Sequence, residues 1–295
     1  MREIFELLSD SLIDAFIDTL KIAPFLFFIY LLMEFIYHKA GDKTNKLLLR
    51  SGKVAPMIGG ILGVFPQCGF SAACSSLFSG GVIGAGTLLA VFLSTSDEML
   101  PVMITSSVPI TTILKVLLTK VIIGALVGMA AELLISAIKH KHHDHSDEET
   151  HIHEMCEHDG CHCEKGIWLS ALHHFLGIAV YILIFSFVLN VAISAIGEEK
   201  LASLLVGTPV LGQMISALIG LIPNCASSIV ITDLYVNGII TSGVMMSGLL
   251  AGSGVGLMVL FKTNKNIKQN ILIALSLYGS GVLFGVLIDA LKITF

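Results

Sequence analysis

The chain has 295 residues, of which 55% are hydrophobic and 13% are charged, and its net charge is -5, with a mean hydropathy of +0.88. Soluble domains carry about 25% charged residues, so this chain lacks the polar side chains that a soluble surface needs. We therefore predict an integral membrane protein. Residues 1–10 are acidic and polar, unlike a cleaved signal peptide, so the first apolar span is expected to remain as a helix.

Apolar stretches follow one another along the chain near 12–37, 54–65, 69–94, 99–110, 113–138, 168–196, 201–222, 226–236, 238–261 and 270–294. Several are shorter than the roughly 20 residues that a helix needs to cross a bilayer. We predict an all-α fold of about ten transmembrane segments, five in each half, some of them broken. The predicted parts are a first membrane repeat at 1–138, a polar loop at 139–166 and a second membrane repeat at 167–295.

The two halves share a sequence motif. Residues 65–71 read Phe-Pro-Gln-Cys-Gly-Phe-Ser, and residues 222–228 read Ile-Pro-Asn-Cys-Ala-Ser-Ser. The two cysteines lie 225 − 68 = 157 positions apart, and the same offset relates the prolines, the last serine of each motif (Ser71 and Ser228) and several glycines. Because proline interrupts a helix, we expect broken helices at Pro66 and Pro223. Duplicated apolar units with such breaks are typical of membrane transporters built from internal repeats.

Loop charges indicate how the repeats are oriented. The loop after the first span holds Lys39, Lys43, Lys46, Arg50 and Lys53, whereas its counterpart near 196–210 holds only Lys200. The loop at 262–268 holds three lysines, and its counterpart near 105–111 holds none. Because basic loops face the cytoplasm, equivalent loops of opposite character predict inverted repeats, with the central loop cytoplasmic. Lys115 and Lys120 are expected to snorkel to the outer membrane surface.

Polar residues at the breaks are the candidate substrate pathway. An amide offers a donor and an acceptor, a thiol is a soft ligand, and a carboxylate in the bilayer is normally retained for ion binding or proton transfer. The predicted pathway residues are Gln67, Cys68, Ser71, Asp97, Glu98, Asn224, Cys225, Ser228 and Asp233. The structural alternative is that prolines kink the helices and small residues let them pack closely. For Asp97 and Glu98 the alternative is an exposed turn at the membrane edge.

Two further patterns have structural interpretations. Glu132 and Asp289 are related by the repeat and lie close to helix ends, so we predict that they cap helices. Repeated glycines, such as Gly84, Gly86 and Gly248, are expected to allow close helix packing. None of them forms a phosphate-binding loop, so transport would be driven by an ion gradient or by the gradient of the substrate.

The central loop is rich in metal ligands. Its candidate ligands are His140, His142, His143, His145, His151, His153, Cys156, His158, Cys161, His162 and Cys163. With few apolar residues the loop cannot build a core, so it is predicted to be disordered. Imidazole, carboxylate and thiolate groups bind first-row divalent metals, which favours metal capture over a solvated linker. Its spacing differs from that of a zinc finger.

Three segments together resemble a known family. They are Pro-Gln-Cys-Gly-Phe-Ser at 66–71, Gly-Thr-Leu-Leu-Ala-Val-Phe-Leu-Ser-Thr-Ser-Asp-Glu at 86–98 and Pro-Asn-Cys at 223–225. With them the chain resembles the ten-transmembrane heavy-metal exporters, a group that includes proteins named as manganese transporters and arsenic efflux permeases. The resemblance covers essentially the whole chain and implies metal or metalloid export by a secondary carrier.

The leading hypothesis is export of a divalent transition metal, manganese first, with a coupling proton at Asp233 or Glu98. An alternative is efflux of arsenite or an organoarsenical bound by Cys68, Cys74 and Cys225. A third possibility is a membrane metal sensor that does not transport. No nucleophile with a base and no cofactor motif stands out, so we predict neither an enzyme nor a resident cofactor. The expected partners are the metal ion and the lipid bilayer, and not nucleic acid.

Overall fold

The computed structural model describes residues 2–39, 54–64, 68–96, 98–141, 167–196 and 210–295, and within them every regular element is a helix. The first half contains α1 (Arg2–Lys39), α3 (Ala55–Leu62), α4 (Cys68–Ser79), α5 (Ala85–Ser94), α6 (Met99–Thr105) and α7 (Ile110–Lys141). The second half contains α9 (Ile167–Ile196), α11 (Leu211–Gly220), α12 (Cys225–Val236), α13 (Ser242–Ala251), α14 (Gly256–Thr263) and α15 (Ile267–Ala290). The predicted all-helical class is confirmed.

The helices of the two halves follow the 157-residue offset of the sequence. Adding 157 to both bounds of α4 gives the bounds of α12, and adding it to those of α5 gives α13. The turns between these helices also agree. Gly81 and Gly238 have φ of 73° and 71°, and their N–H groups donate to Phe78 O and Tyr235 O. The duplicated sequence therefore folds into duplicated local structure.

Each half contains two interrupted helices. The first interruption separates α3 from α4 and α11 from α12, and Pro223 lies in the second of these gaps, as predicted. Pro66 lies outside the described residues, between the end of α3 at Leu62 and the start of α4 at Cys68. The second interruption separates α5 from α6 and α13 from α14, inside what the sequence predicted as one apolar stretch at 238–261.

The predicted single stretch at 69–94 is also wrong, because α4 ends at Ser79 and α5 begins at Ala85. The positive φ of Gly81 turns the chain between them. Taken with their continuations, four described segments are long and apolar enough to cross a membrane, namely Ala85–Thr105, Ile110–Ala137, Ser242–Thr263 and Ile267–Ala290. Large apolar side chains remain exposed on the outer helices, for example Leu118 on α7 and Leu272 on α15, as lipid contact requires.

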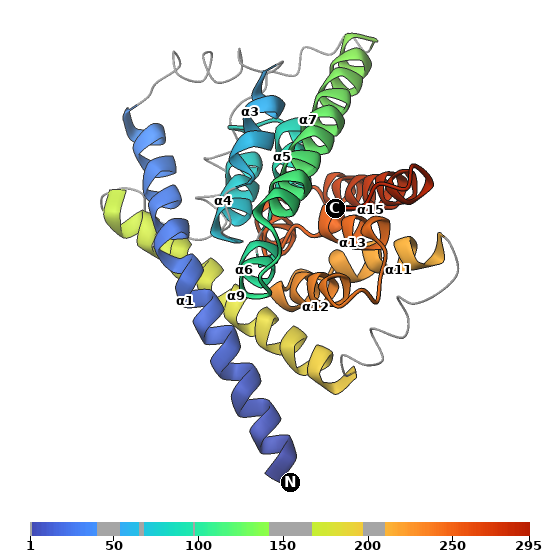
Figure 1. Cartoon of the computed structure of the whole chain (residues 1–295). Helices are drawn as coiled ribbons and strands as arrows, with labels where there is room; N and C mark the ends of the chain where they lie inside the picture. The colour runs from blue at the N-terminus through green and yellow to red at the C-terminus, as the bar shows by residue number, and fades with distance from the viewer. Residues whose placement is uncertain (1, 40–53, 65–67, 97, 142–166, 197–209) are drawn as a thin grey trace.

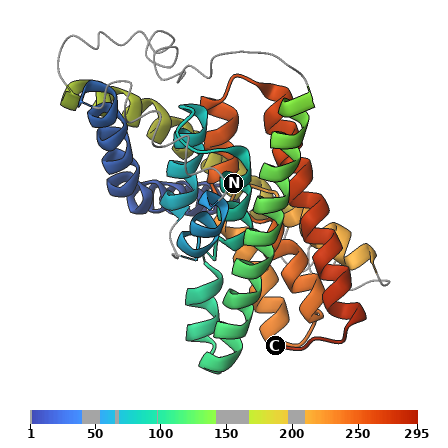
Figure 2. The same cartoon turned by 90° about the horizontal axis from the view of Figure 1, so that it is seen from above.

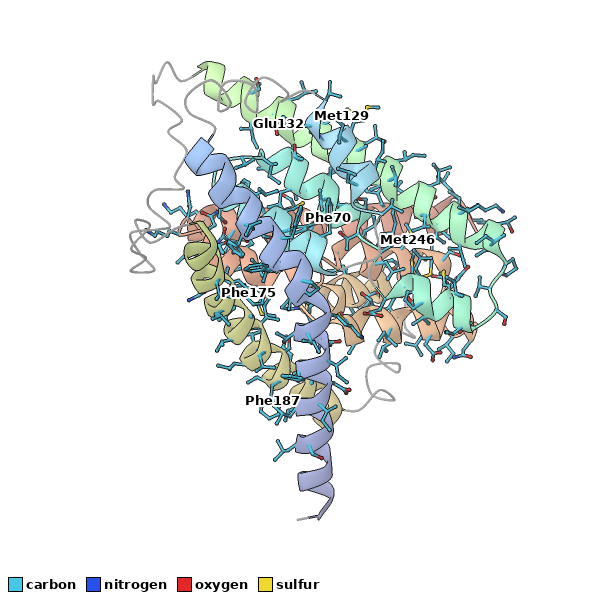
Figure 3. The ribbon with its side chains drawn as sticks, turned by 90° about the vertical axis from the view of Figure 1, so that its left-hand side faces the viewer. Phe70, Met129, Glu132, Phe175, Phe187 and Met246 are labelled. Carbon is cyan, nitrogen blue, oxygen red and sulfur yellow. The ribbon has the colours of Figure 1, made fainter. Side chains whose placement is uncertain are left out.

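The halves are interleaved rather than side by side. Within each half α5 packs on α7 and α13 packs on α15, but α4 packs on α14 and α12 packs on α6, across the halves (Figure 2). The long helices α1 and α9 cross at one side of the molecule (Figure 1). Figure 3 shows this pair in front, with Phe175 of α9 labelled. The rings of Phe27 and Phe175 meet edge to face, with 5.7 Å between their centroids. The centre is formed by α5 and α13, whose Phe92 and Met245 are fully buried.

Close glycine contacts fix the spacing inside each half. A Cβ on Gly128 of α7 would lie 2.5 Å from the carbonyl oxygen of Gly86, and a Cβ on Gly285 of α15 would lie 2.6 Å from that of Gly243. The two pairs are themselves related by the 157-residue offset. The interpretation of the glycines as close-packing residues is therefore confirmed at these contacts.

Replacing Gly285 by Ala is expected to lower the melting temperature of the detergent-purified protein, because overpacking costs about 1–3 kcal/mol. Gly279→Ala, on the same helix, is the matched control, since nothing lies within 4 Å of its added Cβ. Thermal unfolding of both variants and the wild type measures the difference. Equal melting temperatures for the two variants would contradict the close contact between α13 and α15.

Candidate functional site

The gap between α13 and α14, residues 252–255, is buried at the centre of the molecule and is bordered by both predicted serines. An added Cβ at Gly256 would lie 2.9 Å from Ser71 Oγ, and one at Gly252 would lie 3.6 Å from Ser228 Oγ. Ser71 comes from α4 of the first half and Ser228 from α12 of the second. The structure thus brings these two repeat-related hydroxyls to one helix break, which we call the central break.

The central break also contains a hydroxyl group without a partner. Ser253 is 1% exposed, and its Oγ makes no hydrogen bond to any described residue. Its counterpart in the first half, Ser96, donates to Val64 O at 2.7 Å. Buried polar groups are nearly always paired, so an unpaired hydroxyl at a helix break marks a place for a ligand or water. Sequence reasoning missed Ser253, although the 157-residue offset from Ser96 was a usable signal.

A buried lysine lies beside the same break. Lys120 is 1% exposed and donates through Nζ to Thr95 O and, at 2.9 Å, to Leu249 O. The prediction that Lys120 snorkels to the membrane surface is wrong, whereas Lys115 is exposed. Insertion of a lysine at the centre of a membrane helix costs about 2.5–3.5 kcal/mol. The two carbonyl bonds offset part of that cost and explain why the side chain points inward.

Asn224, predicted as a pathway amide, joins three helices in this structure. It is the N-cap of α12, where its Oδ1 accepts a hydrogen bond from Ala226 N at 3.2 Å. Its Nδ2 donates to Asn190 Oδ1 of α9 at 2.6 Å. Asn190 in turn donates to Ser11 O of α1 at 3.5 Å. Both ends of the Asn224 amide are therefore occupied by protein groups, and a bound substrate would have to displace one of them.

The cysteines differ in their distance from the breaks. Cys225 is buried directly after the Asn224 cap and packs with Ile182 and Val255, the latter in the central break. Cys74 is buried two turns into α4, in the main apolar core. Neither is disulfide-bonded. Cys225 is therefore the described thiol that lies at a break.

The predicted acids lie apart from one another. Asp233 is exposed near the end of α12 and accepts a hydrogen bond from Asn237 Nδ2 at 3.0 Å. It lies eight residues, or about 12 Å along the helix, from Cys225 at the α11–α12 interruption, and its side chain is exposed whereas residues 252–255 of the central break are buried. Glu98 is half-buried at the N-cap of α6, and its carboxylate interacts electrostatically with that of Asp18 on α1.

Glu132 and Asp289 cap helices, as predicted. Asp289 accepts hydrogen bonds from Gly243 N at 2.9 Å and Thr241 Oγ1 at 2.7 Å, at the start of α13. Glu132 accepts from Gly86 N at 3.2 Å at the start of α5. A carboxylate at a helix N-terminus is favoured by unpaired N–H groups and by the helix dipole. These two acids therefore have a structural role in each half.

The remaining predicted site residues lie outside the described part. These are Pro66, Gln67, Asp97, His142, His143, His145, His151, His153, Cys156, His158, Cys161, His162 and Cys163, while the side chains of Cys68 and His140 are also outside it. Within the described residues, no group of three or more His, Cys, Asp or Glu side chains is placed to hold a metal ion. The described polar atoms at the central break are hydroxyl and carbonyl oxygens and one ammonium group.

The duplicated interrupted helices and the long apolar spans define a multi-pass membrane protein with a buried polar centre. A family model described as "Putative, 10TM heavy-metal exporter" matches residues 3–180. The chain belongs to this family of ten-transmembrane heavy-metal exporters. Neither the search of curated proteins nor the search of solved structures found a match.

The hydrogen bond between Asn224 and Asn190 predicts coupled stability effects. We expect Asn224→Ala to cost about 1 kcal/mol through loss of the N-cap, and the Asn190→Ala cost to be non-additive with it by about 0.5 kcal/mol or more. Thermal unfolding of the wild type, both single variants and the double variant gives a double-mutant cycle for this pair. Asn237→Ala, which lies in an exposed turn, is the control. Strictly additive effects of the two substitutions would contradict the contact between α9 and α12.

Proposed function

We propose that this protein is a secondary-active exporter of a divalent transition metal ion, with manganese as the preferred substrate. The main support is the buried central break, where Ser71, Ser228 and the unpaired Ser253 lie at the gap between α13 and α14. Interrupted helices at membrane depth expose backbone groups that transporters use to bind substrates. Family membership supports heavy-metal export.

The chemistry of the described oxygens favours a hard cation. Hydroxyl and carbonyl oxygens suit manganese, whereas thiolates favour softer metals. In this proposal the serines of the central break act with Gln67 and Asn224 amides and with Asp97 and Glu98, which would supply the negative charge. Cys68 and Cys225 would add softer ligands at the edge of the proposed metal site. Because oxygen atoms outnumber thiols among these groups, manganese ranks above zinc or cadmium.

Alternating access of the two halves is the proposed mechanism. The matched helix bounds and the opposite charge character of equivalent loops support an inverted repeat. In such carriers one repeat rocks against the other around a fixed central site. The interleaving of α4 with α14 and of α12 with α6 would couple the movements of the halves. This orientation puts the loop at 139–166 in the cytoplasm.

Coupling to a proton would use an acid on the pathway. Glu98 lies at the α5–α6 interruption and adjoins Asp97 in sequence, so it is the better-placed candidate for the site itself. Asp233, exposed near the end of α12, would act at a mouth of the pathway. An acid at a mouth attracts the cation and accepts a proton as the metal leaves.

Replacement of Ser253 by Ala is expected to reduce manganese export, with the apparent metal affinity falling about tenfold or more. Because Ser253 Oγ has no partner among the described residues, alanine should leave the fold intact. Cells without their own exporters would express each variant and be loaded separately with manganese, zinc, cadmium or arsenite. Their content is then measured by elemental mass spectrometry.

Ser94→Ala is the matched control for this experiment, because Ser94 is equally buried but bonds within its own helix. Wild-type cells should hold less manganese than cells with an empty vector, and Ser253→Ala cells should hold more than Ser94→Ala cells. Equal manganese in the two variants would contradict a role for Ser253. If cells that express the wild-type protein hold the same amount of every element as cells with an empty vector, the result would instead favour the metal sensor.

The two buried cysteines separate the arsenical alternative from the leading proposal. In arsenite efflux, Cys225→Ser would abolish export because its thiol lies at a break, and the wild type would deplete arsenic alone. Cys74→Ser is the companion variant, buried in the core two turns from the break. Arsenic export that needs Cys225 and not Cys74 would place a thiol site at the α11–α12 interruption and replace the manganese proposal.

The central loop is proposed to collect metal beside the cytoplasmic mouth. Deleting residues 140–163 removes all of the predicted loop ligands, His140 to Cys163. We expect the metal concentration for half-maximal transport to rise severalfold, with the maximal rate largely unchanged, because local capture raises the effective concentration. Metal uptake into inverted vesicles at graded manganese concentrations measures both quantities. An unchanged concentration dependence would refute loop capture.

A further inference from the structure

The ammonium group of Lys120 lies where two helices end. Thr95 is the C-cap of α5, and Leu249 lies in the last turn of α13, so one carbonyl comes from each half of the molecule. Nζ of Lys120 donates a hydrogen bond to both oxygens. We propose that these two carbonyl groups belong to a binding site for a monovalent cation, which the protein fills with its own lysine.

The electrostatics of the two helix ends favour a cation at this position. The last carbonyl groups of a helix have no partner further along it, and they carry the negative end of the helix dipole. Here the ends of α5 and α13 both direct a carbonyl oxygen at the same atom. Interrupted helices of membrane carriers bind monovalent cations through such C-terminal carbonyl groups, and a primary ammonium group carries the same charge as those ions.

The second half provides an internal comparison. Lys120 on α7 corresponds to position 120 + 157 = 277, which is Leu277 on α15. Leu277 is 0% exposed and Lys120 is 1% exposed, so both positions are equally buried. A leucine therefore fills the repeat-related position without any charge. The fold of a half does not require a cation there, and the lysine is specific to the carbonyl pair that it binds.

A third oxygen is available close by in the chain. Ser253 follows Leu249 by four residues, is buried, and has no hydrogen-bond partner among the described residues. Carbonyl and hydroxyl oxygens are ligands that alkali cations accept, whereas a lysine on a single tether cannot reach every oxygen around it. The unpaired hydroxyl is thus consistent with a cation site whose occupant is tethered on one side.

The tethered cation has a consequence for energy coupling. A site that is filled from within cannot respond to sodium or potassium outside, so the wild-type protein should be indifferent to both ions. Lys120 also keeps a divalent cation away from the carbonyls of Thr95 and Leu249 by charge repulsion. The ligand here is a monovalent cation rather than the exported metal, and only Ser253 is common to this site and to the proposed metal site. The test below is made without the exported metal, so the two proposals can fail independently.

The test replaces Lys120 by Ala and supplies the missing cation from solution. The detergent-purified Lys120→Ala protein is melted in chloride salts of sodium, potassium, methylammonium and choline at equal ionic strength. We expect it to melt below the wild type in choline, and to be stabilised by about 3 °C or more in a saturable manner by at least one of the other three cations. The wild type should show no such difference between salts.

Leu277→Ala is the matched control, because it also removes a large buried side chain, at the repeat-related position. It should melt below the wild type and respond equally to all four salts. A Lys120→Ala protein that behaves in the same way would overturn the proposal, as would one that cannot be recovered folded in any of these salts. Lys120→Met then gives an independent check: it should melt below the wild type in every salt, and a melting temperature equal to that of the wild type would show that the charge is not needed.

Discussion

Inside a bilayer there is no water to bond with backbone groups that a helix interruption sets free, so the protein itself must supply their partners. The described centre of this molecule is built around that requirement. Lys120 donates to the carbonyl group of Thr95 at the end of α5 and to that of Leu249 in the last turn of α13. Asn224 accepts from the first turn of α12. Interrupted helices are thereby stable at the place where a carrier needs polar backbone.

The duplication explains which of these features occur twice. The acids that cap α5 and α13, the paired glycine contacts and the turns at Gly81 and Gly238 all recur at the same offset. Of the polar groups at the centre, Ser71 and Ser228 recur, but others do not. Lys120 corresponds to Leu277 in the other half, and buried Ser76, which bonds Tyr30 at 2.8 Å, corresponds to exposed Asp233. Packing is repeated, while the buried ammonium group beside the central break is present in one half only.

Sequence reasoning predicted the parts that depend on local signals. Pro223 and the repeated motif located the α11–α12 interruption, and the repeated acids were correctly assigned as caps. The α13–α14 interruption was missed because its glycines have the same composition as a tightly packed helix. The direction of the Lys120 side chain depends on which carbonyls α5 and α13 bring near it, and no local pattern contains that information. The exposure of Asp233 could not be predicted, because its position in the sequence does not show on which side of α12 it lies.

The packing of α4 on α14, across the two halves, has a consequence for folding during synthesis. α4 is synthesised early, with Ser71, Ser75 and Ser79 spaced along the face that meets α14 through Gly256 and Thr263. Ser75 and Ser79 also donate to Ser71 O and Ser75 O within α4, so these two hydroxyls have partners before α14, about 180 residues later in the chain, is synthesised. The bonds inside α4 therefore let its serines enter the membrane before α14 exists, and the contact between α4 and α14 forms only after the second half has been inserted.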